Sequence, residues 1–249
     1  MNSSIKILLL AAVVVICSNA CDKDVRPAQP VIQKGKITGR ITNSRGQAIH
    51  GATIIQEHTV WFNSFVSTNS DVTGNYEADI PTSPSGSWSA KATLTKSAFG
   101  QNYKFDLHPD ASGSFNANNN VVRNFQWNLT GERPNGGQYG AHVDVYAIGN
   151  GIPLTQVKLV FTPFPGETTL IDGSAITGFE RELEEVAGTF MVRDIPIGKY
   201  MVKAVAPGRT LLLDYKHDNG DPQLNKPVIF GKYGFLADTE YNLAFWLSE

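Results

Sequence analysis

Cysteine is nearly absent from this sequence of 249 residues. The two cysteines are Cys17 and Cys21, and none follows residue 21. Residues 22–249 therefore offer no disulfide, no thiolate metal site and no thiol nucleophile. Because 41% of the residues are hydrophobic, we expect the burial of apolar side chains alone to stabilise the fold.

Motifs that carry catalysis or bind ions are missing as well. The sequence contains no G-x-S-x-G, no H-E-x-x-H and no phosphate-binding loop. The acidic stretch 214–222 misses the spacing of a calcium loop, and the acidic residues of 182–185 have no recognisable aromatic cleft around them. The five histidines are scattered: His50, His58, His108, His142 and His217. We therefore expect no enzymatic activity, no metal and no cofactor.

Long basic and apolar runs are also lacking. The formal net charge is −2, and no basic stripe suggests a nucleic-acid partner. The longest apolar run covers residues 7–17, which is too short to span a bilayer as a permanent helix. Together with Lys6 before it and small residues after it, this run is typical of a secretory signal peptide over residues 1–20.

The end of this run resembles the lipobox of bacterial lipoproteins, through Ser18-Asn19-Ala20-Cys21. The resemblance implies that Cys21 becomes the lipid-bearing first residue and anchors the protein to a membrane. The triplet Asp22-Lys23-Asp24 resembles the export signal of Bacteroidetes-type lipoproteins, which implies display on the outside of the outer membrane. We interpret residues 21–34 as the lipidated cysteine with a flexible tether.

After residue 35 the sequence predicts an all-β protein, because short alternating runs follow one another between turn residues. Strands are expected within 36–42, 51–57, 65–80, 85–95, 121–129, 141–148, 155–163, 187–195, 198–206 and 240–248. The segment 65–80 is expected to form a strand, a turn and a second strand, with Asp71 and Gly74 in the first and last positions of a type I turn. The segment 178–188 is compatible with a short helix or an exposed hairpin. The breaker-rich stretch 131–140 is the preferred boundary between a module at 35–132 and a module at 139–249. Each module ends in a strand with a tryptophan, which weakly indicates an internal duplication.

Residues 34–96 resemble the carboxypeptidase regulatory-like domain, a transthyretin-like (prealbumin-like, Ig-like) β-sandwich. The match consists of Gly39-Arg40-Ile41-Thr42, a turn and strand at 46–54, and Asp71-Val72-Thr73-Gly74-Asn75-Tyr76. In the second module, residues 192–200 match the family's last element, and 151–154 suggest its first turn. The resemblance implies two tandem sandwiches and implies no catalytic residue.

Two adjacent aromatic residues, Trp61 and Phe62, are the candidate ligand-facing side chains. If they lay on a strand, they would point to opposite faces, and one would be exposed. Packing against the other module or under a loop is the alternative for this pair. Trp88, Trp127 and Trp246 lie in alternating strands and are expected in the core.

These observations lead to a non-enzymatic surface lipoprotein that binds or presents a ligand, as an accessory to glycan or nutrient capture. Its expected partners are the membrane, through the lipid, and a glycan or protein at the cell surface. The alternative is a pilin-like or adhesin subunit that assembles by strand exchange.

Overall fold

The computed structural model describes residues 35–249 except 83–84, 120, 150, 217–219 and 233–236. These residues belong to one compact unit. They form strands and one short 3₁₀ helix, η1 (Leu154–Gln156), which confirms the all-β prediction. In this part of the chain no helix has the length and apolar character that crossing a membrane requires. The predicted signal, tether and lipid site (residues 1–34) lie outside the described residues.

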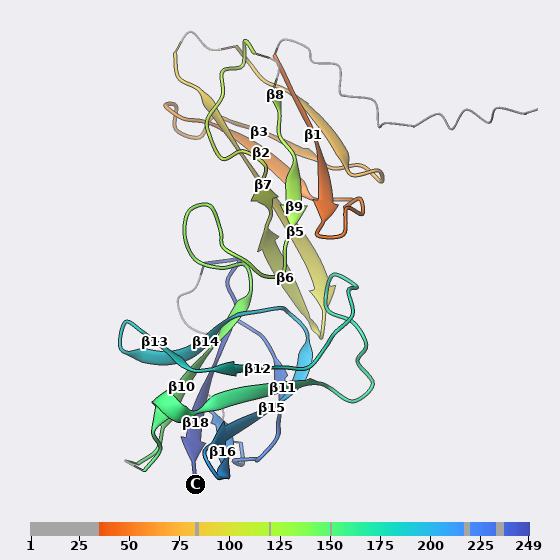
Figure 1. Ribbon diagram of the computed structural model, residues 1–249. Helices are drawn as coiled ribbons and strands as arrows, with labels where there is room; N and C mark the ends of the chain where they lie inside the picture. Colours follow the sequence, from red (N-terminus) through yellow and green to blue (C-terminus); the bar gives the residue numbers. More distant parts are fainter. Residues whose placement is uncertain (1–34, 83–84, 120, 150, 217–219, 233–236) are drawn as a thin grey trace, which may run out of the picture. The chain divides into compact units, whose positions relative to one another are not determined.

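The first half of the chain forms two sheets (Figure 1). One sheet has the order β4-β1-β9-β7, with β8 also paired to β1. The other has the order β3-β2-β5-β6. The strands of the first sheet are β1 (Lys36–Asn43), β4 (Asn75–Asp79), β7 (His108–Pro109), β8 (Val121–Val122) and β9 (Phe125–Trp127). Those of the second are β2 (Thr53–His58), β3 (Phe65–Asn69), β5 (Trp88–Ala98) and β6 (Gln101–Asp106).

Alternation along these strands fills the space between the two sheets. Ile37 and Ile41 of β1 are fully buried, and so is Ile54 of β2. Trp88 and Trp127 are also buried, as predicted. All five belong to one hydrophobic cluster, so the first half is a β-sandwich with residues of both sheets in its core.

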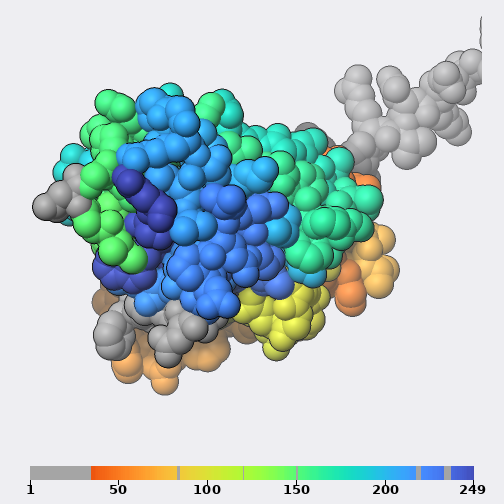
Figure 2. Space-filling view, turned by 90° about the horizontal axis from the view of Figure 1, so that it is seen from below, coloured from red at the N-terminus to blue at the C-terminus, as the bar shows by residue number. Residues whose placement is uncertain are grey.

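The second half forms one nine-stranded sheet with the order β12-β11-β15-β16-β18-β10-β14-β13, and β17 also pairs with β15. β16 pairs with β15 near its start and with β18 near its end. It therefore joins the strands β12-β11-β15 to the strands β18-β10-β14-β13. Figure 2 shows β10 (green) beside the dark blue C-terminal strand. The strands are β10 (Ala141–Ala147), β11 (Lys158–Pro163), β12 (Phe179–Glu182), β13 (Glu184–Val186), β14 (Thr189–Ile195), β15 (Lys199–Ala206), β16 (Arg209–Tyr215), β17 (Lys226–Ile229) and β18 (Asn242–Ser248).

Both halves repeat one strand order. β1 lies between β4 and β9, and β10 lies between β14 and β18. In each case the first strand pairs in parallel with the tryptophan-bearing last strand. The series β3-β2-β5-β6 corresponds to β12-β11-β15-β16, with antiparallel pairs throughout. This is the topology that an internal duplication predicts, and it makes the β11–β12 connection the counterpart of the β2–β3 connection.

The predicted turn between β3 and β4 is present. The backbone N–H of Gly74 donates to the carbonyl of Asp71 at 2.9 Å, and Gly74 has φ +78°. A Cβ at this position would lie 2.5 Å from the carbonyl oxygen of Ile41, so glycine is required. The turn carries the chain from one sheet to the other and places Tyr76 in the core.

Two other predictions are changed by the structure. The segment 178–188, left open between helix and hairpin, forms the edge strands β12 and β13 with Leu183 buried between them. Trp246 was expected in the core, but it is only half-buried. Its neighbours Phe245 and Leu247 take the core positions of β18.

Candidate functional site

The connection between β2 and β3 displays large apolar side chains at the surface. We call residues 59–64 the aromatic loop. The exposed fraction is 50% for Trp61 and 100% for Phe62, and Phe65, the first residue of β3, is 56% exposed. The alternative is that Trp61 and Phe62 pack against another part of the protein. Among the described residues nothing covers Phe62, and half of the Trp61 side chain is exposed. Clustered exposed apolar side chains mark an interaction surface.

Trp61 and Phe62 do not lie on a strand, so they do not alternate between the faces of a sheet. Both lie in the loop, because a turn closes at this point: the backbone N–H of Ser64 donates to the carbonyl of Trp61 at 3.4 Å. Asn63 takes φ +60°, a conformation that asparagine adopts more readily than most residues. The turn leaves both aromatic side chains exposed.

His58, the last residue of β2, anchors the aromatic loop through its imidazole ring. Its side chain is buried, and its Nδ1 accepts the backbone N–H groups of Val60 (3.2 Å) and Trp61 (3.1 Å). Since Nδ1 accepts, the ring proton of the neutral imidazole lies on Nε2, which donates to the carbonyl of Ser85 at 3.1 Å. One side chain thus links the loop to the segment before β5.

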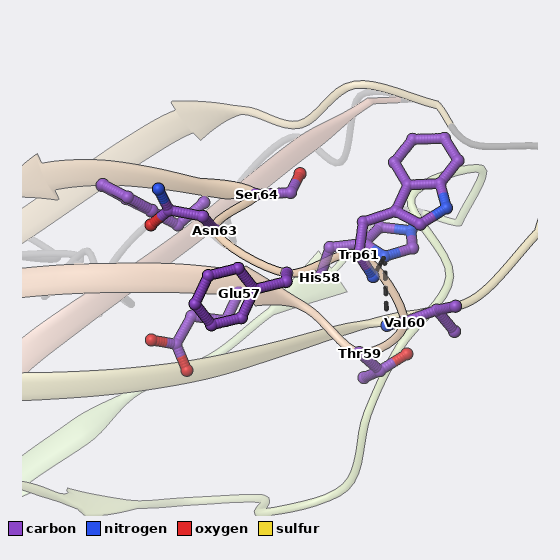
Figure 3. A pocket seen from close by; sticks show the side chains of 9 residues that line it. Glu57, His58, Thr59, Val60, Trp61, Asn63 and Ser64 are labelled. Carbon is purple, nitrogen blue, oxygen red and sulfur yellow. Dashed lines mark hydrogen bonds between the residues drawn. The ribbon is translucent and has the colours of Figure 1, made fainter.

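The indole of Trp61 lies on the imidazole of His58. The ring centroids are 4.7 Å apart with an interplanar angle of 20°. Trp88 contacts His58 edge-on, with ring centroids 5.1 Å apart and an interplanar angle of 86°. The three rings therefore form a continuous series of contacts from the surface to the core. Figure 3 shows the Trp61 ring over the His58 ring. Trp61 is therefore exposed and at the same time held in place.

Polar groups line the pocket beside the exposed ring. This pocket has a volume of about 530 Å³ and is lined by residues 57–65. The carboxylate of Glu57 accepts from the ammonium of Lys91 at 2.6 Å, which fixes it at the outer face of the sheet. The hydroxyl of Thr59 lies 3.1 Å from that of Ser87. The pocket combines an aromatic wall with hydrogen-bonding side chains, as ligand sites commonly do.

The counterpart of the aromatic loop in the second half behaves differently. The β11–β12 connection, residues 164–178, turns its apolar residues inward: Ile176 is buried, and Leu170 and Ile171 pack against the core. Its aromatic residue, Phe164, is covered by the ammonium of Lys199 at 4.2 Å from the ring centroid. Exposure of aromatic residues is thus a property of the first loop and does not follow from the topology alone.

A second aromatic pair, Tyr146 and Trp246, lies on the outer face of β10 and β18. The rings are 5.3 Å apart and both are half-buried. The ammonium of Lys216 lies 3.6 Å from the Tyr146 centroid and 5.4 Å from the Trp246 centroid. A cation already occupies the ring faces here, which favours the aromatic loop as the candidate site.

The remaining residues singled out in the sequence do not gather into a second site within the part of the chain that the structure describes. Cys21 and Asp22, Lys23 and Asp24 lie outside the described residues, as does part of the acidic stretch 214–222. Asp214 accepts from the buried ammonium of Lys226 at 2.8 Å. Glu184 forms an ion pair with Arg193, whose guanidinium holds the pKa of that carboxyl below its usual value. Within the described ranges, no group of potential metal ligands gathers.

We expect the His58→Ala variant to release the aromatic loop. The change removes two backbone hydrogen bonds and the ring stack under Trp61, and should lower the free energy of unfolding by about 2 kcal/mol. Acrylamide quenching of tryptophan fluorescence should increase, with the Trp61→Phe variant identifying the part due to Trp61. The matched control is His142→Ala on β10, whose ring makes no stack with a tryptophan in the described part of the chain. Unchanged quenching in His58→Ala would show that the loop needs no anchor.

Comparison with known proteins gives no family. No family model matches the chain, and no curated protein matches it. The resemblance to the carboxypeptidase regulatory-like domain therefore rests on the residues quoted above.

Several solved bacterial structures align with this chain at low sequence identity and low TM-score. The TIE protein of Bacillus anthracis is 11% identical with a TM-score of 0.31, and a streptococcal ancillary pilin is 10% identical with a TM-score of 0.26. A single B repeat of the collagen-binding surface protein of Staphylococcus aureus is 12% identical with a TM-score of 0.25. These alignments cover 86%, 84% and 87% of this chain, and 34%, 61% and 100% of the others. The chain thus spans about a third of the first protein and less than two thirds of the second.

Proposed function

We propose that this chain is a non-enzymatic binding module displayed at the cell surface, and that its aromatic loop binds a carbohydrate. The observation that carries the proposal is the Trp61 indole, which is half-exposed while it stacks on the buried, hydrogen-bonded ring of His58. A side chain that is already held in its binding conformation loses little entropy when a ligand arrives.

A carbohydrate fits the chemistry of the pocket. The apolar face of a sugar ring can lie on the free face of the Trp61 indole, while its hydroxyl groups need hydrogen-bonding partners around the ring. Asn63 and Ser64 line the same pocket and can donate and accept such bonds. The carboxylate of Glu57, already paired with Lys91, supplies a further acceptor.

The proposed location follows from the sequence. Lipid attachment at Cys21 would hold the module at the outer membrane, and Asp22-Lys23-Asp24 would direct it to the outer face. The tether up to residue 34 would then separate the aromatic loop from the lipid surface. In this arrangement the module serves as an accessory to glycan or nutrient capture.

The alternative role, a pilin-like or adhesin subunit assembled by exchange of a terminal strand, meets an obstacle. β18 is paired on both sides, with β16 and β10, and its Leu243, Phe245 and Leu247 are buried. β1 is likewise an interior strand, between β4 and β9. Removing either strand would open a core, so exchange of these strands is costly. The aromatic loop needs no such rearrangement to bind.

The proposal is tested by binding of the purified protein to a printed array of oligosaccharides. We expect the protein to select a small set of related sugars, and the Trp61→Ala variant to lose these signals. Capture of a protein partner through Trp61, with no sugar bound, would overturn the carbohydrate part of the proposal. Sugar binding that survives in Trp61→Ala would overturn the assignment of the site.

A further inference from the structure

Among the described residues β3 pairs only with β2, so it is an edge strand whose outer row of backbone groups meets no neighbouring strand. Its inner neighbour is β2, and the bonds that flank β3 show which residues face it: His58 N–H donates to the Ser64 carbonyl, and Ser70 N–H to the Ala52 carbonyl. In an antiparallel pair these directions alternate, so Val66 and Thr68 also face β2. The N–H and C=O groups of Phe65, Ser67 and Asn69 then point to the open edge.

This edge lacks the features that usually prevent pairing with another chain. Charged residues and proline protect sheet edges from such pairing. The strands at the other ends of the three strand orders carry them: Glu77 and Asp79 on β4, Lys104 and Asp106 on β6, Pro109 on β7, Glu180, Arg181 and Glu182 on β12, and Glu184 and Glu185 on β13. The counterpart of β3 in the second half is β12, so the same position in the repeated topology is protected in one half and open in the other. β3 itself, Phe-Val-Ser-Thr-Asn, has no charge and no proline.

We propose that a second copy of this chain pairs with β3 antiparallel, so that two four-stranded sheets become one continuous sheet across a two-fold axis. With the axis at Ser67, this residue pairs with the partner's Ser67, and Phe65 pairs with the partner's Asn69. The three residues that point to the open edge on each copy would then exchange their hydrogen bonds with each other. Because a symmetric pair places like residues together at the axis, an uncharged strand is required, and β3 is uncharged.

Exposed apolar side chains at both ends of β3 fit the same pairing. Phe65 opens the strand, and Val72, which is 76% exposed, lies in the turn after it. Antiparallel pairing brings Phe65 of each copy toward the end of the partner strand that is followed by Val72. Apolar surface at each end is then partly covered in the dimer, while the Trp61–His58 stack keeps its own neighbours. This inference does not depend on what the aromatic loop binds.

The proposed pairing of β3 is tested by placing charged residues at the two-fold axis. Sedimentation equilibrium should show the wild-type protein in a concentration-dependent monomer–dimer equilibrium. Ser67→Glu and Ser67→Lys each place like charges at the axis, and should weaken self-association by roughly tenfold or more. An equimolar mixture of the two variants should restore association as a mixed dimer. Ser67 is exposed, so both variants should fold with the thermal midpoint of the wild type at dilutions where the wild type is monomeric.

The matched control is Thr95→Glu, which adds the same charge at an exposed position of the interior strand β5 and should leave association unchanged. A wild-type protein that stays monomeric at all concentrations would overturn the proposal. So would Ser67 variants that associate as the wild type does. Association that is lost in Trp61→Ala but kept in both Ser67 variants would assign the contact to the aromatic loop and overturn the pairing of β3.

Discussion

The Gly39→Ala variant is expected to lose about 3 kcal/mol of unfolding free energy, because β1 has no space for a side chain at this position. An added Cβ would lie 1.7 Å from the carbonyl oxygen of Arg123 and 2.8 Å from the Tyr76 ring. The same carbonyl accepts the hydroxyl of Tyr76 at 2.6 Å, and Tyr76 packs in the core. Moving the backbone near Arg123 to make space would also break this bond.

Urea unfolding followed by circular dichroism measures the effect. The matched control is Gly113→Ala, because a Cβ on Gly113 meets no atom within 4 Å. It should change the unfolding free energy by less than about 0.5 kcal/mol. Equal stability of the two variants would show that the chain near Arg123 moves freely, and that Gly39 does not fix the distance between β1 and its neighbours.

The Trp61→Ala variant is expected to lose affinity for the array-selected oligosaccharide by about thirtyfold, or roughly 2 kcal/mol. The indole supplies the apolar face for the sugar, and its stack on His58 makes it rigid before binding. Phe62→Ala should cost less, since Phe62 is fully exposed and makes no ring contact within the described chain. Isothermal titration calorimetry of the three proteins gives these affinities.

The control for this variant is Leu224→Ala. Leu224 is 53% exposed, close to the 50% of Trp61, and lies in the second half of the chain. It should bind as the wild type does. If Leu224→Ala and Trp61→Ala lose affinity equally, general surface hydrophobicity drives the binding and the aromatic loop is not the site. If neither loses affinity, the ligand binds elsewhere.

Local signals in the sequence were sufficient for much of the fold. Alternation located most strands of both halves, and the Asp71–Gly74 turn was predicted because its hydrogen bond and its glycine conformation depend on four adjacent residues. The tryptophan-bearing strands at the end of each half suggested a duplication, and the pairing of β9 and β18 with the first strands supports it. Alternation and the turn could be predicted because they depend on residues that are close together in the sequence.

The aromatic loop could be predicted only in part. Trp61 and Phe62 were singled out by their chemistry, but the run of apolar and aromatic residues resembles a strand, and the turn that ends at Ser64 was missed. The role of His58 depends on the carbonyl of Ser85 and on Gly86, where a Cβ would lie 2.5 Å from the imidazole. These partners are far along the chain, and the sequence alone contains no signal that joins them.

The density of charged residues in 178–188 did not distinguish a short helix from an exposed hairpin. The glutamates and arginine are compatible with a solvated helix, but edge strands also tolerate charge because one side of each faces water. In the structure Leu183 lies between the two short strands and is buried. Trp246 was misplaced for a related reason: both faces of β18 carry apolar residues, so alternation does not identify the inner one.

The most direct test of the carbohydrate site follows the indole N–H groups by ¹H–¹⁵N NMR during titration with the array-selected oligosaccharide. The four tryptophans each contribute one indole signal, and substitution of Trp61 assigns its own. We expect the Trp61 signal to shift in a saturable manner, while the signals of the buried Trp88 and Trp127 stay in place. Saturation of the protein with no change at Trp61 would contradict it.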